Sequence, residues 1–289
     1  MAFDPFAPSL WKLGHGREIE IGPRAVIMGV LNVTPDSFSD GGRYERPDAA
    51  IRRARRMARE GAAIIDIGGE SSRPGFNEIS AAEEQDRILP VFEALKNDGI
   101  LLSVDTWRAE TAVLAVKAGA HIINDVWGFQ RDKELAGVAA NHSSGCLLMH
   151  TGRERDKDAD VIRDQHAFLK ESLKAAAAEG VERERIMLDP GFGFAKDHQE
   201  NIDLLARMEE LFSLGYPILT GTSRKRFIGH VTGRSAGRRD TGTAATSVIA
   251  RMKGSAVFRV HDVAKNRDAL RIADAVLAAE GRVLSQPSP

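Results

Sequence analysis

Short apolar runs alternate with longer amphipathic segments along almost the whole chain. The apolar runs have the length of buried strands, and the segments between them repeat their apolar residues with a helical period. Eight such pairs follow one another. The strands are expected at 25–32, 62–69, 100–105, 121–125, 146–150, 185–189, 217–221 and 256–261.

Helix start and stop signals separate these units. The sequence SAAEE, which begins at Ser80, is typical of a capping box, and Asp48 is expected to cap the first helix. Gly61 and Gly119 stand where helices are expected to end. The helices are expected at 48–60, from 80 onward, and at 108–118, 132–140, 161–179, 201–212, 241–253 and 263–280.

Eight strand–helix pairs in 289 residues match an α/β fold of the (β/α)₈ type, the TIM barrel. The alternative, a doubly wound open sheet, is less well supported because no G-x-G-x-x-G follows the first strand. We expect a single barrel domain at 25–282. A hairpin in the extension 1–24 is expected to close the barrel floor, and 283–289 to be a disordered tail.

Composition narrows the class of protein. The 40 Lys and Arg residues nearly balance the 41 Asp and Glu residues, which argues against a general binder of nucleic acid or membrane surfaces. The single cysteine, Cys146, excludes an internal disulfide and suits a reducing cytoplasm. The N-terminus does not resemble a signal peptide, and no apolar stretch is long enough to span a bilayer. We therefore expect a soluble cytoplasmic protein.

Polar and charged residues stand where the expected strands end, which is where the active sites of barrels lie. Any single Asp or Asn there can be the N-cap of the next helix. Capping, however, needs no cations, and cations near helix N-termini favour a bound anion between them. The strand-end residues are Asn32, Glu70, Ser72, Arg73, Asp105, Asn124, Asp125, His150, Asp189, Ser223, Arg224, Lys225, Arg259 and His261.

These residue types suit a flat heterocycle that carries a phosphate. The carboxylates of Asp105 and Asp189 and the amide of Asn124 can accept N–H bonds from an amino-pyrimidine edge. Lys225 can donate to a ring carbonyl, and the planar guanidinium of Arg259 can lie on the ring face. For the Lys225 region, a solvated basic loop remains the alternative.

Anion and metal contacts are expected at the same mouth. Arg73, Arg259 and His261 can hold a phosphate or diphosphate. Asn32 offers an oxygen of the kind that Mg²⁺ uses beside phosphates. His150 has no Cys or His cluster around it in the sequence, so we do not expect a zinc site.

The stretch DPGFGFAKD, 189–197, adds a possible pocket wall. Its two glycines let the backbone approach a ligand, and Phe194 can pack beside a flat ring. Phe192 is expected in the core. Met149, at the end of a strand, is a further pocket candidate.

Seven segments, taken in order, resemble the dihydropteroate synthase family from about residue 25 to the last helix. They are MGVLNVTPDSFSDGG, IDIGGESSRPG, SVDT, IND, LDPGFGFAKD, GTSRKRFIG and RVHDV. The resemblance implies a TIM barrel, usually a homodimer, that acts in folate synthesis. It implies the joining of 6-hydroxymethyl-7,8-dihydropterin diphosphate to 4-aminobenzoate, with release of diphosphate and formation of 7,8-dihydropteroate.

The resemblance also implies roles for individual residues. Arg259 matches a residue that lies on the pterin and touches the diphosphate, His261 one that binds the diphosphate, and Asn32 the one associated with Mg²⁺. Asp105, Asp189, Lys225, Arg259 and His261 form the expected catalytic set. Pterin-binding positions are matched by Asp105, Asn124, Asp189 and Lys225, and the expected substrate contacts further include Met149, Phe194 and Ser223.

Two loops of the family close over the diphosphate and shape the aminobenzoate pocket. By resemblance, Phe38 and Asp40 belong to the first of these loops, and Ser72 and Arg73 to the second. Ser72 departs from the family's usual threonine and keeps only the hydroxyl.

A second departure follows the fifth strand. The chain reads MHTGRERDKD where the family often has MHM-G-P, and the charged segment 152–160 is interpreted as a solvated loop. Two other functions stay open. One is a pterin-binding barrel that transfers a methyl group from a methylated folate, and the other is a catalytically silent pterin-binding paralogue.

Overall fold

The computed structural model describes residues 3–34, 45–70 and 78–283. Within these residues, eight parallel strands form one sheet in the order β8-β7-β6-β5-β4-β3-β10-β9. A bridge between Leu188 and Ile218 joins the two edge strands, so the sheet closes into a barrel. The strands are β3 (Val26–Asn32), β4 (Ile64–Gly68), β5 (Leu101–Asp105), β6 (Ile122–Asp125), β7 (Gly145–Met149), β8 (Ile186–Asp189), β9 (Leu219–Thr220) and β10 (Val257–Val260).

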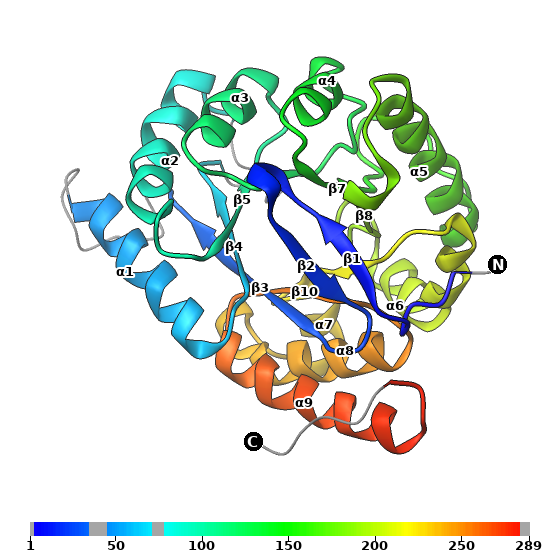
Figure 1. The fold of residues 1–289 in the computed structure, drawn as a ribbon. Helices are drawn as coiled ribbons and strands as arrows, with labels where there is room; N and C mark the ends of the chain where they lie inside the picture. Colours follow the sequence, from blue (N-terminus) through cyan, green and yellow to red (C-terminus); the bar gives the residue numbers. More distant parts are fainter. Residues whose placement is uncertain (1–2, 35–44, 71–77, 284–289) are drawn as a thin grey trace.

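Helices surround this barrel as an outer layer (Figure 1). Their order along the chain alternates with the strands, which confirms the predicted (β/α)₈ fold. The α-helices of the described residues are α1 (Glu45–Glu60), α2 (Ala81–Leu95), α3 (Ala109–Lys117), α4 (Glu134–Asn141), α5 (Val161–Ala178), α6 (His198–Arg207), α7 (Arg226–Thr232), α8 (Asp240–Met252) and α9 (Val263–Ala279).

Three helix predictions need correction. Helix α1 begins at Glu45, so Asp48 lies inside the helix and does not cap it. The helix predicted at 201–212 is shorter and starts earlier, because α6 ends at Arg207 and Met208–Leu214 forms a 3₁₀ helix. Helix α7 was not predicted, since its seven residues are fewer than the periodic pattern of a helix needs to show. The cap at Ser80 is confirmed: its hydroxyl accepts the backbone N–H of Glu83.

The N-terminal hairpin closes one end of the barrel. Strands β1 (Ser9–Lys12) and β2 (Glu18–Ile21) pair antiparallel, and Figure 1 shows them across the centre of the ring. Trp11, Leu13 and Ile21 are buried against inward-facing apolar residues near the starts of the barrel strands. The Trp11 indole N–H donates to the carbonyl of Arg185 at 2.9 Å. The predicted hairpin at the barrel floor is therefore confirmed.

Inward positions recur at every second residue of a strand, and their character changes along the barrel. Near the floor they are apolar, for example Met28, Ile64 and Met187. Their outward neighbours, such as Ile27 and Ile65, pack under the helices, so the strands are apolar on both faces. Two or four residues further on, the inward positions become polar or charged, and they are Asn32, Asp66, Asp105, Asn124, Asp189 and Arg259.

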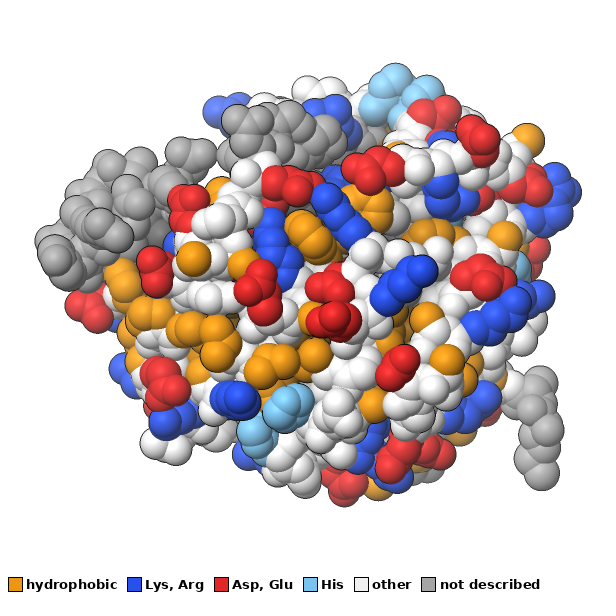
Figure 2. All heavy atoms as spheres, turned by 90° about the horizontal axis from the view of Figure 1, so that it is seen from above, with side chains coloured by type: hydrophobic (Ala, Val, Ile, Leu, Met, Phe, Trp, Pro, Cys, Tyr) orange, Lys and Arg blue, Asp and Glu red, His pale blue; other side chains and the backbone are white. Residues whose placement is uncertain are grey.

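The mixed charge of the surface and the burial of the single cysteine agree with what the composition predicts. Acidic and basic side chains intermingle over the face in Figure 2, without a large block of one sign. Cys146 is buried, and burial raises the pKa of its thiol to about 12, which leaves it unreactive. None of the helices in the described residues has the length and apolar character needed to cross a membrane.

Candidate active site

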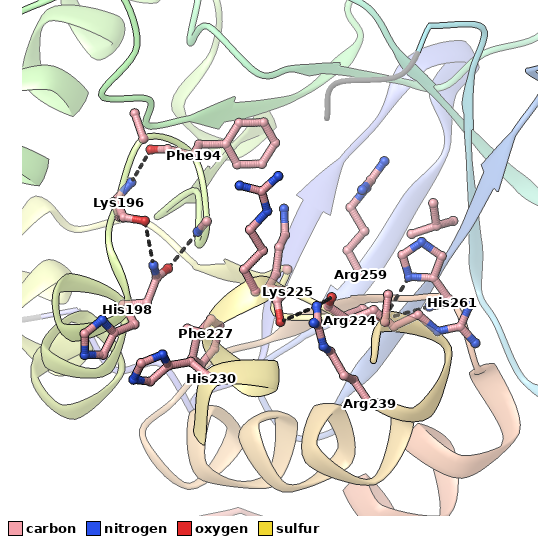
Figure 3. Close-up of a pocket in the computed structure, with 18 of the residues that line it drawn as sticks. Phe194, Lys196, His198, Arg224, Lys225, Phe227, His230, Arg239, Arg259 and His261 are labelled. Atoms are coloured by element: carbon pink, nitrogen blue, oxygen red, sulfur yellow. Dashed lines mark hydrogen bonds between the residues drawn. The ribbon is translucent and has the colours of Figure 1, made fainter. Parts of the chain in front are cut away.

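A cavity of about 800 Å³ opens where the strands end. Figure 3 shows Phe194, Lys225, Arg259 and His261 among the side chains that surround it. The expected site residues that line it are Asn32, Phe194, Ser223, Lys225, Arg259 and His261. Strands β8, β9, β10 and β3 are neighbours around the closed barrel, and this brings the residues together.

Arg259 connects the cavity to two buried carboxylates. Its Nε donates to Asp66 Oδ2 and one Nη donates to Asp105 Oδ2, both at 2.6 Å. Asn124 Nδ2 also donates to Asp66 Oδ2, at 3.1 Å. Asp66 is fully buried, and its Oδ1 has no hydrogen-bond partner within the described part of the chain. Asp105 and Asn124 therefore lie at strand ends, as predicted, and Asp105 contacts Arg259, which lines the cavity.

Asp66 is the residue that sequence analysis missed. It stands inside the apolar run of β4, two residues after the inward-facing Ile64 and two before the end of the strand. A carboxylate at an inward position of a buried strand needs a cation or several donors. A carboxylate within an apolar run is thus the signal in the sequence that points to Asp66.

Burial shifts the pKa values of these groups. It raises the pKa of the Asp105 carboxyl to about 7, against the opposing charge of Arg259. Burial also raises the pKa of Asp189, although the N–H of Gly191 opposes it. For Arg259, burial alone would lower the pKa, but the carboxylates of Asp66 and Asp105 outweigh it and raise the value.

Asp189 begins a loop that forms one wall of the cavity. Its Oδ1 accepts the N–H of Gly191 at 2.7 Å, so part of the carboxylate is already oriented by the backbone. Gly191 has a φ of +64°, and a side chain there would clash with the carbonyl oxygen of His150. Only glycine fits this turn.

Phe194, from the same loop, faces a cation. Lys225 Nζ lies 4.2 Å from the centre of the Phe194 ring, a cation–π distance. Burial and the nearby Arg259 lower the pKa of Lys225 to about 8. The alternative of a solvated basic loop does not fit this placement of Lys225.

Ser223 and His261 form a pair at the cavity edge. Ser223 Oγ lies 2.9 Å from His261 Nδ1 and accepts the backbone N–H of His261 at 3.2 Å. Arg224, by contrast, is bonded to Asp240 at 2.7 and 3.0 Å. The Ser223 hydroxyl thus orients the His261 ring, while Arg224 has a structural ion pair.

Asn32 is half-buried at the end of β3 and lines the cavity. The described residues hold no group of three or more His, Cys, Asp or Glu that could bind a metal ion. Mg²⁺ is commonly bound by one or two protein oxygens together with substrate phosphates. Asn32 fits a metal ion that arrives with a diphosphate, rather than a site built from protein ligands alone.

The remaining residues singled out in the sequence have different outcomes. Met149 is buried and packs with Val126, Trp127 and Phe194 in an apolar cluster at the barrel mouth, whereas Phe192 is fully buried in the core, as expected. Asp125 accepts the backbone N–H groups of the following turn, so it has a local structural role. Phe38, Asp40, Ser72 and Arg73 lie outside the described residues, and their roles stay predictions.

The charged segment 152–160 differs from its prediction. Arg155 donates to both carboxylate oxygens of the buried Asp164, at 2.9 and 2.6 Å. Lys157 donates to the carbonyl of Ala195 and to Glu200. The interpretation of this segment as a solvated loop is therefore wrong for Arg155, which is half-buried, whereas Lys157 is exposed as expected. Their partners lie on other segments, so no local sequence pattern reveals them.

Comparison with known proteins identifies the family. Residues 28–261, from β3 to the end of the barrel sheet, match the protein family described as Pterin binding enzyme. A dihydropteroate synthase of Clostridium beijerinckii is 44% identical over 268 residues, which cover 92% of this chain and 99% of that protein. The chain belongs to the dihydropteroate synthase family.

Solved structures of dihydropteroate synthases share the fold. The Clostridium difficile enzyme, crystallised in the presence of pteroic acid, has a TM-score of 0.87 at 45% identity and covers 89% of this chain and 98% of its own. The Xanthomonas albilineans enzyme with 4-aminobenzoic acid has a TM-score of 0.88 at 41% identity, with coverage of 93% and 99%. The barrel is thus that of a dihydropteroate synthase.

We expect a bell-shaped pH dependence of kcat/KM. With a pKa of about 7, Asp105 is protonated as the pH falls below that value and loses its charge as an acceptor. With a pKa of about 8, Lys225 loses its proton as the pH rises above that value and ceases to be a cation. Activity should therefore be highest between these two values.

The variant Lys225→Arg identifies the alkaline limb. A guanidinium keeps its proton throughout this range, so the alkaline limb should move to higher pH while the acid limb stays in place. An alkaline limb that does not move in a folded, active variant would show that another group titrates there.

Proposed function

We propose that this cavity joins 6-hydroxymethyl-7,8-dihydropterin diphosphate to 4-aminobenzoate and releases diphosphate and 7,8-dihydropteroate. The observation that carries the proposal is the inward polar layer at the strand ends. It combines buried acceptors for a pterin with cations for a diphosphate, in a chain of the dihydropteroate synthase family. The ligands named with the related structures, pteroic acid and 4-aminobenzoic acid, support the two substrate classes.

The pterin is proposed to bind among the carboxylates. One carboxylate can accept two parallel N–H bonds from the amino-pyrimidine edge, and Asp189 is the acceptor that the family resemblance assigns. Asp105 and Asn124 contribute further polar contacts, and Lys225 donates to the ring carbonyl. Arg259 occupies only Oδ2 of Asp105, and Gly191 only Oδ1 of Asp189. Within the described part of the chain, each carboxylate thus has a second oxygen that neither the backbone nor Arg259 uses.

Asp189→Asn should weaken pterin binding by about tenfold or more, since a hydrogen bond to a charged group contributes about 1.5–3 kcal/mol. The amide keeps the shape of the side chain but loses the charge and one acceptor. Calorimetric titration with a pterin that lacks the diphosphate measures this directly. Asp203→Asn, on α6, is the control for removal of a carboxylate outside the cavity. Unchanged affinity in folded Asp189→Asn would refute the role of Asp189.

The reaction is proposed to proceed by substitution at the methylene carbon of the pterin. The C–O bond to diphosphate breaks, a C–N bond to the amine forms, and the amine nitrogen loses a proton. Because an arylamine is a weak nucleophile, departure of diphosphate runs ahead of attack. Negative charge then grows where Arg259, His261 and, by resemblance, Arg73 are placed, and positive charge grows near Asp105 and Asp189.

No covalent intermediate on the protein is required. Among the described residues that line the cavity, Ser223 carries the hydroxyl that lies next to a histidine, and its oxygen accepts the backbone N–H of His261. The surrounding sequence GTSRK lacks the G-x-S-x-G elbow that exposes a nucleophilic serine. Ser223 therefore orients His261 toward the anion.

Mg²⁺ is proposed to arrive with the diphosphate, with Asn32 as its protein ligand. A bound Mg²⁺ would neutralise negative charge on the leaving group. Removal of metal by a chelator should abolish turnover, whereas the affinity for a pterin without phosphates should stay the same. Turnover and calorimetry on the same metal-free sample give both values. Full activity after verified metal removal would exclude this role.

We further propose that the protein is cytoplasmic and forms a homodimer, as the family resemblance implies. The single buried cysteine suits a reducing compartment. Ile272 and Val276 are exposed one helical turn apart on α9, and Ile249 is exposed on α8, which packs against α9. Light scattering coupled to size-exclusion chromatography measures the number of subunits.

A further inference from the structure

The charged segment 152–160 lies along the loop 189–196, which carries Asp189 and Phe194. One backbone hydrogen bond joins them, from the N–H of Gly152 to the carbonyl of Phe194 at 3.4 Å. Just before the segment, the N–H of His150 donates to the carbonyl of Asp189 at 2.9 Å. Lys157 Nζ donates to the carbonyl of Ala195 at 2.8 Å. The segment therefore contacts the loop directly on the side of the cavity wall.

A buried polar network lies beneath this contact. His150 is fully buried, and its Nε2 is 2.9 Å from Oδ2 of Asp164, which is also buried. Arg155 reaches back from the charged segment and binds both oxygens of the same carboxylate. Burial of Asp164 would raise its pKa, but the bonds from His150 and Arg155 lower it, so the carboxylate stays charged.

Lys196 connects this network to the loop. Its Nζ donates to His150 Nδ1 at 2.8 Å and to the carbonyl of Gly191 at 3.0 Å. His150 Nε2 lies 2.9 Å from both Asp164 Oδ2 and Arg155 Nη2, so the ring is held between Lys196 on one side and this ion pair on the other. Burial lowers the pKa of Lys196 to about 7, and burial together with Lys196 lowers the pKa of His150 to about 3, which keeps the ring neutral.

The loop has little freedom to move against these contacts. Gln165, from α5, donates to the carbonyl of Pro190 at 2.9 Å. Gly191 packs so closely on the carbonyl of His150 that no side chain fits there. On the cavity side, the guanidinium of Arg153 lies 4.7 Å from the centre of the Phe194 ring, the same ring that Lys225 contacts. Buried networks with satisfied partners make the surrounding structure rigid.

We propose that Arg155 and Lys196 are positioning residues for the reaction. Through His150 and Asp164 they hold the loop, so that the Phe194 ring stays against Lys225 at the cavity wall. The charged segment 152–160 is then a fixed part of that wall. The inference rests on the proposed function, because it concerns the placement of groups for that reaction. A displacement of a site group by about 1 Å can lower the rate up to about a hundredfold.

A double-mutant cycle tests whether Arg155 acts through Phe194. Arg155→Met should lower kcat/KM for the pterin diphosphate by about tenfold when Phe194 is present. In the Phe194→Ala background, Arg155→Met should lower kcat/KM by less than about twofold, because the ring that the network holds is gone. Arg163→Met is the matched control: this exposed arginine of the same region pairs with Asp158, and its loss should leave kcat/KM unchanged.

An equal loss of kcat/KM with Phe194 and with Ala at position 194 would overturn the inference, because it would show that Arg155 acts on the whole fold. Lys157→Met is a second variant for the same cycle, since it removes the contact to Ala195 without uncovering His150. It should also lose its effect without Phe194, and an undiminished effect would likewise count against the inference. Absence of turnover in the unmodified protein would defeat the proposed function, whereas turnover with additive variants would defeat only this inference.

Discussion

Arg259→Met should lower kcat/KM by about a hundredfold or more. Arg259 is the direct cationic partner of both Asp66 and Asp105, and it lines the cavity where the diphosphate is proposed to bind. Removal of one partner from a buried ion pair costs about 3–5 kcal/mol, and here two carboxylates lose their cation. The variant also loses a positive charge where the leaving group departs. Two-substrate kinetics measure the effect.

The same variant should have a pH-dependent stability defect. Burial already raises the pKa of Asp105 to about 7 against the charge of Arg259, and loss of that charge should raise it further, so the folded variant binds more protons above that pH. The defect in unfolding free energy relative to the unmodified protein should therefore grow as the pH rises above about 7. Arg271→Met, at an exposed position of α9, is the control and should change neither property. A defect independent of pH would contradict the proposed role of Arg259 as a counter-ion.

Asp274→Asn should lower the unfolding free energy by about 3–5 kcal/mol, because it leaves a buried arginine without its carboxylate. Arg251 is fully buried, and its Nε donates to Asp274 Oδ1 at 2.6 Å. Another guanidinium nitrogen donates to the carbonyl of Gly22. The second oxygen of Asp274 accepts the N–H of Ala25 at 3.1 Å. The pair thus joins α8 and α9 to the start of the first barrel strand.

Chemical denaturation of three variants separates this pair from ordinary surface charges. Glu171→Gln breaks an exposed pair with Lys174 and should cost no more than about 0.5 kcal/mol. The double variant Arg251→Met with Asp274→Leu should recover much of the loss, because apolar side chains can replace a buried pair. If Asp274→Asn lowers the unfolding free energy no more than Glu171→Gln does, the Arg251–Asp274 pair contributes little to stability.

The barrel could be predicted from the sequence because its strands are apolar on both faces. Such runs stand out against helices that have only one apolar face. Helix α7 escaped prediction because seven residues show too little periodicity. The start of α1 was placed too late, since Asp48 is a good cap residue but its position within the helix depends on the residues before it.

The candidate site was predicted where a residue stands at a strand end, as for Asp105, Asp189 and Arg259. Closure of the barrel brings such residues together whatever their distance in the sequence. Asp66 was missed because its partner, Arg259, lies 193 residues away and is reached only through the pairing of β4, β3 and β10. Arg155 was misjudged for a similar reason: most charged segments are solvated, and only the fold shows that Asp164 lies within its reach.

The central claim is that the cavity performs a substitution that consumes a pterin diphosphate and an arylamine. The most direct measurement follows diphosphate release and 7,8-dihydropteroate formation by the purified protein, with both substrates, with each one alone, and with the pterin that lacks diphosphate. The account predicts equal amounts of the two products only when both substrates are present. A protein that binds the pterin but forms no dihydropteroate under these conditions would be a silent pterin binder and would contradict the account.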